Sequence, residues 1–351
     1  SYDALGRLHL ATGPRGEALD FGYNAVGNRT CLSIGGVSET YTYNSTTQRL
    51  TSVSGGYTAS YLYDTQGRLT SGPAGTFTWT GLDRLATVTN GSTSASYVYD
   101  GEGRRVKATV NGTTRWFVLD PWGKIVAEYD GTGALLIEHV YLGDRRIASR
   151  LPAGERAYVQ HDALGSSWIV TADTGEPYQI WDYWPFGEAV GMFDGASLLD
   201  APEVLCQGAN PIFCNGFETG NTAGWTCSTG SGCFSPPGEF FEALFTGKKQ
   251  DGETGLFYFE ARHLDPRIGR FASPDPAAFD LTNPQSLNRY VYGINSPFKY
   301  ADPDGREIVV QAHRVSPHNF QFSIRVEAAD KARYPSDSRV NNKNPDPGTY
   351  Y

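Results

Sequence analysis

The chain has 351 residues, of which 19% are charged and 13% aromatic, and its net charge of −9 gives a pI near 5.2. This acidic balance argues against nucleic acid or an anionic membrane as a general partner. No run of 18 apolar residues occurs, so no transmembrane helix is predicted, and 41 glycines with few helix formers indicate an all-β protein.

A six-residue motif, Tyr-Asp-x-x-Gly-Arg, recurs along the first 104 residues. Complete copies occupy residues 2–7, 63–68 and 99–104, and degenerate copies lie between them. The aromatic anchors are spaced by about 20 residues, a period typical of repeat architectures whose units bury their apolar faces against neighbours. These anchors are Tyr2, Tyr23, Tyr43, Tyr63, Trp79 and Tyr99.

Each copy of the motif predicts a β-hairpin. Alternating aromatics such as Tyr61 and Tyr63 lead into the motif and place both rings on one strand face. The Asp or Asn after the anchor favours a turn, the glycine suits a positive φ, and the arginine opens the returning strand. The predicted fold is all-β, with tandem antiparallel hairpins in a continuous curved or spiral sheet and little helix.

The anchor aromatics allow two interpretations. They form either a glycan-binding surface or a structural ladder between neighbouring strands. Because their period follows the turns, which strands require, the ladder is favoured.

The hairpin pattern continues in degenerate form, so we predict a repeat array over residues 1–197. Residues 198–238 are rich in Gly, Ser, Thr and Pro, and are predicted to form a surface insertion. This window contains no CxxC pair and no histidine, which favours two disulfides over a zinc site, with three pairings open. Its cysteines are Cys206, Cys214, Cys227 and Cys233.

Residues 239–305 carry the densest series of specific motifs. In chain order these are Gly-Leu, Asp-Pro, Gly-Arg-Phe, Ser-Pro-Asp-Pro, Leu-Asn-Arg-Tyr and Asp-Pro-Asp-Gly, the last at residues 302–305. The composition changes after Gly305. The tail, residues 306–351, is shorter than a typical domain of ~100 residues.

These motifs resemble RHS/YD-repeat proteins. Residues 1–197 are similar to the YD repeats, and residues 239–305 are similar to the RHS repeat-associated core. The resemblance implies a hollow shell wound from a continuous sheet, with the core closing one end. It also implies that residues 306–351 begin a truncated variable effector segment, and the chain is expected to be a fragment of a longer protein.

The same resemblance implies a function in polymorphic toxins, as a shell that encapsulates and presents its own C-terminal effector. Expected partners are that effector and a toxin-complex or secretion-system protein, with a secreted or cell-surface location. The alternative is an extracellular or cell-surface adhesin that binds glycans through its repeats. No phosphate loop or metal-binding spacing occurs, so no cofactor and no enzyme acting on external substrates is predicted.

Family members that cut themselves after the Asp-Pro-x-Gly motif imply an aspartic-type site here. Such a site needs two carboxylates that share a proton. By this resemblance Asp275 is the first candidate, and its partner is Asp302, Asp265 or Asp280, in that order. An arginine would polarise the scissile carbonyl, and the candidates are Arg270, Arg262 and Arg289.

Cleavage is expected in the region of Gly305, Arg306 and Glu307. A competing interpretation is that Asp275 and Asp302 only cap turns, since Asp-Pro and Asp-x-x-Gly are common turn sequences. Arg306 also departs from the apolar residue that family members often carry at this junction.

Overall fold

A computed structural model of the chain describes residues 1–175, 177–191, 244–276, 287–306, 309–310, 313–316 and 319–321. The predicted insertion, with its four cysteines, and most of the tail lie outside these residues. The described part is built from antiparallel strands, which confirms the all-β prediction. A short 3₁₀ helix, η3, spans Gly293–Asn295.

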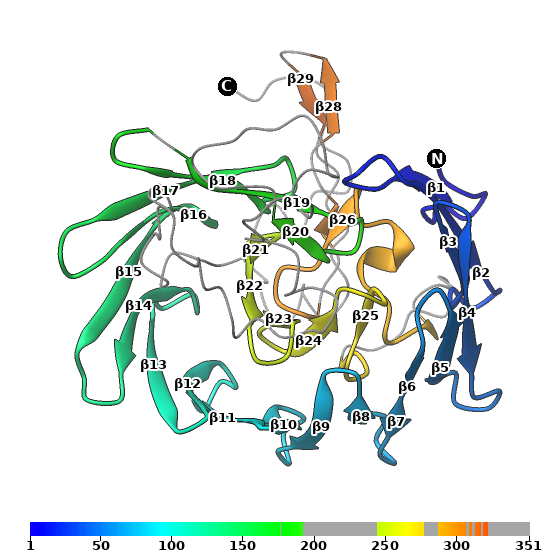
Figure 1. The fold of residues 1–351 in the computed structure, drawn as a ribbon, viewed down its shortest axis with the longest axis horizontal. Helices are drawn as coiled ribbons and strands as arrows, with labels where there is room; N and C mark the ends of the chain where they lie inside the picture. Colours follow the sequence, from blue (N-terminus) through cyan, green and yellow to red (C-terminus); the bar gives the residue numbers. More distant parts are fainter. Residues whose placement is uncertain are drawn as a thin grey trace, which may run out of the picture.

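The strands follow one another in chain order and form a curved wall (Figure 1). The first sheet contains β1 (Leu10–Thr12), β2 (Ala18–Tyr23), β3 (Arg29–Ile34), β4 (Val37–Tyr43), β5 (Leu50–Gly55) and β6 (Ala59–Ser60). The second contains β7 (Leu62–Tyr63), β8 (Leu69–Gly72), β9 (Gly75–Trp79), β10 (Leu85–Asn90), β11 (Thr93–Tyr99), β12 (Arg105–Val110), β13 (Thr113–Leu119), β14 (Ile125–Asp130), β15 (Leu135–Leu142), β16 (Arg145–Arg150), β17 (Arg156–His161), β18 (Ser167–Ala172), β19 (Pro177–Tyr183) and β20 (Ala189–Gly191). Tyr61 alone separates β6 from β7, so the two sheets form one wall.

The core segment, residues 244–276 and 287–306, lies inside the wall (Figure 1). Its sheet contains β21 (Leu244–Phe245), β22 (Lys248–Asp251), β23 (Leu256–Phe259), β24 (Arg262–Asp265) and β25 (Arg270–Phe271). Two-stranded pairs follow, formed by β26 (Tyr300–Ala301) with β27 (Val309–Val310) and by β28 (His313–Ser316) with β29 (Asn319–Gln321).

In the three complete copies of the motif, the turn is held by the Asp and Arg side chains. In the second complete copy, Asp64 accepts a hydrogen bond from the Arg68 backbone N–H at 2.9 Å and another from Arg68 Nε at 2.7 Å. Gly67 has φ +92°, as the hairpin prediction requires. The degenerate copy at Trp79 has Asp83 at this position, with φ +59°.

Each repeat also bonds to the repeats on both sides. The motif arginine reaches forward, since Arg49 Nη1 donates to the Asp64 carbonyl at 2.6 Å and Arg84 Nε donates to the Gly103 carbonyl at 2.9 Å. The anchor reaches backward, since the Tyr99 hydroxyl donates to the carbonyl of Leu85 at 2.8 Å. The strand register shifts at these anchors, and such bulges increase local twist and accompany the curvature of the wall.

The first aromatic of each lead-in pair points into the concave face. These rings are at most 5% exposed, and they are Phe21, Tyr41, Tyr61, Phe77 and Tyr97. The core segment covers them and forms one hydrophobic cluster with them, which includes Phe257, Phe259 and Leu264. The anchors are partly buried against the same cluster, which agrees with the ladder interpretation.

A buried ion pair joins the wall to the core segment. Arg105 on β12 donates from Nη1 and Nη2 to the two carboxylate oxygens of Asp251 on β22, both at 2.7 Å. Both side chains are at most 5% exposed. The rings of Tyr97 and Tyr258 lie 5.1 and 4.2 Å from the guanidinium carbon, so the charge is surrounded by aromatic carbon as well as by its partner.

The two ends of the wall meet. The rings of Phe21 on β2 and Phe186, in the turn between β19 and β20, are 5.8 Å apart in an edge-to-face arrangement. Arg29 stacks on both rings, at 5.1 and 4.5 Å. In Figure 1 the last strands accordingly run back toward the first ones, around the core segment.

Substitutions at two glycines distinguish the cost of backbone strain from the cost of a steric clash with the core segment. Gly67 and Gly133 both have positive φ in equivalent turns, but a Cβ on Gly67 would lie 2.5 Å from the Tyr290 hydroxyl, whereas one on Gly133 meets nothing within 4 Å. Gly133→Ala should lower the free energy of unfolding by about 1–2 kcal/mol through strain alone. Gly67→Ala should cost about 1–3 kcal/mol more, as measured by urea unfolding. Equal costs would contradict the contact.

The buried ion pair gives a second prediction. Asp251→Asn leaves Arg105 buried without its counter-charge and should cost about 3–5 kcal/mol in urea unfolding. The control is Glu138→Gln, which removes the exposed partner of Arg150 and should cost less than about 1 kcal/mol. A small cost at Asp251 would mean that the pair does not hold the core in place.

Candidate functional site

Two of the predicted carboxylates meet at one arginine in the core segment. Nη2 of Arg262, on β24, lies 2.9 Å from Oδ2 of Asp275 and 2.8 Å from Oδ2 of Asp302. The Arg262 and Asp302 side chains are 3% and 2% exposed, whereas that of Asp275 is 24% exposed. The structure therefore brings one buried and one water-accessible carboxylate to the same guanidinium group.

Asp302 also holds the predicted cleavage region. Its Oδ1 accepts hydrogen bonds from the backbone N–H groups of Gly305 at 2.7 Å and Arg306 at 3.1 Å. Gly305 has φ +76°, and a Cβ there would collide with the carbonyl oxygen of Phe259. The predicted junction is thus packed against the β23–β24 turn, with its backbone fixed by one of the candidate carboxylates.

The backbone of Asp275 is fixed by Arg289. The Asp275 N–H donates to the Arg289 carbonyl at 2.7 Å, and Arg289 Nε donates to the Asp275 carbonyl at 3.0 Å. Arg262 Nη1 donates to the same Arg289 carbonyl at 3.3 Å. Two of the three candidate arginines therefore belong to this site, and Arg262 is the one that contacts both carboxylates.

The third candidate arginine, Arg270, takes part in the contact between core and wall. Its Nη1 donates to Asn28 Oδ1 at 3.0 Å, and its guanidinium stacks on the rings of Tyr43 and Tyr290. Asp265 accepts the Arg267 backbone N–H at 3.0 Å, away from Arg262 Nη2. Two further predicted residues, Asp280 and Glu307, lie outside the described residues.

The arrangement at Arg262 favours ionised carboxylates over a shared proton, because a guanidinium within hydrogen-bond distance stabilises the charged form of each. Chemically, Asp275 can accept a proton from a water molecule that reaches it, and Arg262 can stabilise a developing oxyanion. The motif order pointed to the aspartates but did not single out Arg262. The sequence feature that could have identified Arg262 is its position three residues before Asp265, on the strand that ends at Asp-Pro.

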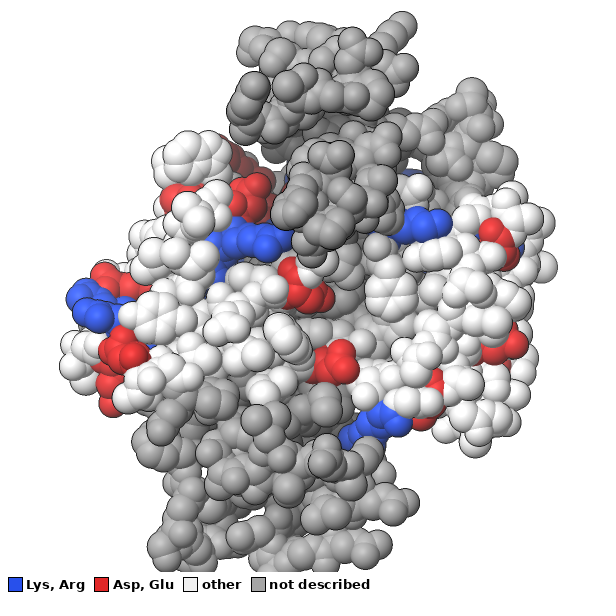
Figure 2. Space-filling model, turned by 90° about the horizontal axis from the view of Figure 1, so that it is seen from above, with Lys and Arg blue, Asp and Glu red and all other residues white. Residues whose placement is uncertain are grey.

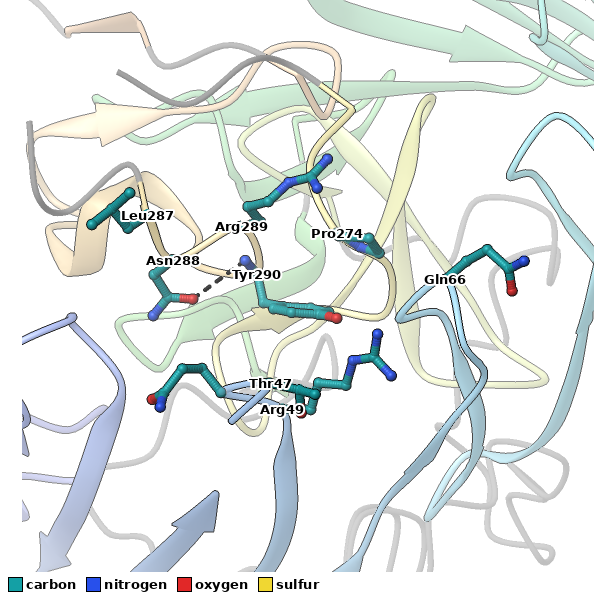
Figure 3. Close-up of a pocket in the computed structure, with 9 residues that line it drawn as sticks. Thr47, Arg49, Gln66, Pro274, Leu287, Asn288, Arg289 and Tyr290 are labelled. Atoms are coloured by element: carbon teal, nitrogen blue, oxygen red, sulfur yellow. Dashed lines mark hydrogen bonds between the residues drawn. The ribbon is translucent and has the colours of Figure 1, made fainter. Parts of the chain in front are cut away.

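A small cavity of about 170 Å³ adjoins this site, where wall turns meet the core segment (Figure 3). Its lining includes Arg49 and Gln66 from the wall, and Pro274 and Arg289 from the core. In Figure 3 the two arginines lie on opposite sides of the Tyr290 ring. Because Arg49 donates to wall carbonyls and Arg289 donates to Asp275, the polar groups around the cavity serve the turns and the site backbone.

Two of the histidines and the free cysteine have other surroundings. His161, which has the anchor position of its repeat, bonds to the carbonyls of Gly165 and Arg146 at 2.9 and 2.7 Å. Burial lowers the pKa of His263 to about 4. Cys31 is exposed and free. Among the residues that the structure describes, no group of three metal-binding side chains occurs, and no helix is long and apolar enough to cross a membrane.

The chain is similar in sequence to several known proteins. A family model described as Teneurin YD-shell matches residues 1–191. The tRNA nuclease WapA of Bacillus subtilis (strain 168) is 43% identical over 61 residues, which cover 17% of this chain and 3% of that protein. The toxin subunit YenC2 of Yersinia entomophaga is 39% identical over 61 residues, covering 17% of this chain and 6% of that protein. The chain thus matches only a small part of the length of these relatives.

Two solved structures are similar to this chain at low sequence identity and low TM-score. The crystal structure of TcdB2-TccC3-Cdc42 covers 87% of this chain and 18% of its own, with 19% identity and a TM-score of 0.45. The Photorhabdus luminescens Tc holotoxin pore, solved with a mutation in TccC3, covers 92% of this chain and 18% of its own, with 18% identity and a TM-score of 0.46.

Substitutions at Asp302 separate its two roles. Asp302→Asn keeps an oxygen that accepts the Gly305 and Arg306 N–H groups but removes the charge beside Arg262, and should cost about 1–3 kcal/mol. Asp302→Ala also leaves the buried Gly305 N–H without its acceptor and should cost roughly a further 1–3 kcal/mol, whereas the Arg306 N–H keeps Asp304 Oδ1 as an acceptor at 3.0 Å. Urea unfolding measures both. If the two variants lose the same stability, Asp302 does not hold the turn.

Proposed function

Because the chain belongs to the Teneurin YD-shell family, we propose that it is part of an exported shell whose core segment holds and presents the polypeptide that follows residue 305. The observation that carries this proposal is the position of the core segment. It covers the concave aromatic face of the wall, and its end, at Gly305 and Arg306, is fixed by Asp302.

The toxin-related part of the proposal has separate support. One curated relative is named as a toxin subunit and another as a tRNA nuclease, and each shares a segment of 61 residues with this chain. We therefore place the chain in a polymorphic toxin, with its own C-terminal effector and a toxin-complex or secretion-system protein as partners.

The surface agrees with protein partners. On the face shown in Figure 2, acidic and basic side chains are dispersed among uncharged ones, without a large basic field. Glycan binding through the anchors would need exposed rings, but Tyr43, Trp79 and Tyr99 are partly buried and donate to strand carbonyls at 2.7–2.8 Å. The shell is therefore preferred to the adhesin.

The proposal includes cleavage of the chain at the Arg262 site. Asp275 accepts a proton from water as the water oxygen attacks a peptide carbonyl between residues 305 and 307. Arg262 stabilises the resulting oxyanion, and protonated Asp275 then returns the proton to the leaving amine. Asp302 remains ionised and holds the scissile turn. Because the reacting groups belong to one chain, proximity supplies much of the rate acceleration.

Intact-mass measurement of the purified 351-residue chain tests this step. We expect two fragments that part between Gly305 and Glu307, and a single uncut chain for Asp275→Asn, which lacks the base. The matched control is Asp144→Asn, whose side chain is 98% exposed in a distant turn, and it should cut like the unmodified chain.

An uncut unmodified chain, or equal cleavage in Asp275→Asn, would overturn the cleavage proposal. The shell proposal would remain, because it depends on the packing of the core segment rather than on the cut.

A further inference from the structure

The small cavity beside the candidate site is lined by one arginine from the wall and one from the core segment (Figure 3). Arg49 is the motif arginine of the repeat anchored at Tyr43, and Arg289 belongs to the core segment. The volume of about 170 Å³ is smaller than the ~300–1,000 Å³ of pockets for drug-sized ligands, but it exceeds the space that one water molecule needs. The cavity therefore suits a small ligand.

Both guanidinium groups keep N–H donors beyond those that bond to the chain. Arg49 donates from Nη1 to the Asp64 carbonyl at 2.6 Å and from Nη2 to the Thr65 carbonyl at 3.1 Å. Arg289 donates from Nε, at 3.0 Å, and from Nη2 to the Asp275 carbonyl. Because a guanidinium carries five N–H donors, each side chain can donate to a further acceptor in the cavity.

The carboxylates near these bonds are held by other arginines. Asp64 and Asp275 offer only their backbone carbonyls here, since their carboxylates pair with Arg68 at 2.7 Å and with Arg262 at 2.9 Å. Among the residues that the structure describes, no acidic side chain lines the cavity. The positive charges of its two arginines are therefore not neutralised by a described carboxylate.

A third guanidinium group faces the same aromatic ring. Arg270 lies 5.3 Å from the centre of the Tyr290 ring, and Asp265 is its partner in the β24–β25 register. Burial raises the pKa of Tyr290, and Arg270 and the two cavity arginines all oppose that rise. Positive charge thus gathers around this ring, and an anion in the cavity would reduce the repulsion between the arginines.

We propose that the cavity is a binding site for a small oxyanion, a carboxylate or phosphate group, which bridges Arg49 of the wall and Arg289 of the core segment. Guanidinium groups bind both kinds of oxyanion through charge-assisted, bidentate hydrogen bonds. Thr47 and Gln66, which also line the cavity, carry a hydroxyl and an amide as further donors. A bound oxyanion ties the core segment to the wall beside Asp275.

The affinity is modest because water reaches both arginines. Arg49 is half-buried and Arg289 is exposed, and solvent screens charge interactions at such positions. We therefore expect a Kd on the order of 1 mM, at the weak end of the affinity scale. At this Kd, about 10 mM of the anion lowers the unfolding equilibrium constant roughly tenfold, because the anion binds only the folded chain.

Equilibrium dialysis and urea unfolding of the 351-residue chain test the site, with inorganic phosphate and acetate as probes and chloride at equal ionic strength and pH as the reference. Saturable binding of at least one probe is expected, with a roughly tenfold lower unfolding constant at about 10 mM. A response to acetate alone supports a carboxylate ligand, and a response to phosphate alone supports a phosphate group. Dialysis applies equally to the cut and the uncut chain, so its result is independent of the cleavage proposal.

Arg49→Gln and Arg289→Gln should each abolish saturable binding and the stabilisation by the anion. The matched control is Arg15→Gln, which removes the same charge from an exposed turn between β1 and β2 and should leave binding unchanged. If an arginine variant does not fold, Gln66→Glu places a competing carboxylate at the cavity and should weaken binding roughly tenfold. No saturable binding of either probe, or equal binding by the arginine variants, would overturn the proposal.

Discussion

The concave face of the wall is aromatic and must be covered, and this constraint determines the rest of the structure. Without the core segment, the wall would expose to water the aromatic ring that each lead-in pair places on its concave face. The core segment supplies the opposite surface, with Phe257, Phe259 and Leu264 completely covered. Burial of apolar surface provides the stabilisation, while the Arg105–Asp251 pair fixes the position in which the core sits, because a displaced partner would leave a charge buried alone.

The repeat motif propagates the wall by bonds in both directions along the chain. An anchor donates to the strand behind it, and a motif arginine donates to the turn ahead of it. Each of these bonds joins residues of two successive motif copies, so a repeat gains its full set of contacts only inside an array. The curved wall brings its last hairpin around the core to its first strands. The contacts that close the wall are therefore made between residues that are remote in sequence.

Much of this fold is predictable from sequence because its cause is local. The alternation at Tyr61 and Tyr63, the turn-forming Asp64 and the positive φ of Gly67 depend on neighbours a few residues away. The pairing of Arg105 with Asp251 and that of Arg267 with Glu39 depend on how the core docks, which no local pattern encodes. At the candidate site, the motifs identified Asp275 and Asp302, but the choice of Arg262 over Arg270 required the β24–β25 geometry.

The central claim is that wall and core form one cooperative unit in which the core supports the wall. Native-state hydrogen exchange in increasing, subdenaturing urea tests it most directly, by comparing the opening free energies of amides in β22–β24 with those in β10–β12. The account predicts that the two sets converge on one common opening free energy, because neither surface is stable without the other. Complete exchange of β22–β24 at urea concentrations where β10–β12 remain fully protected would contradict it.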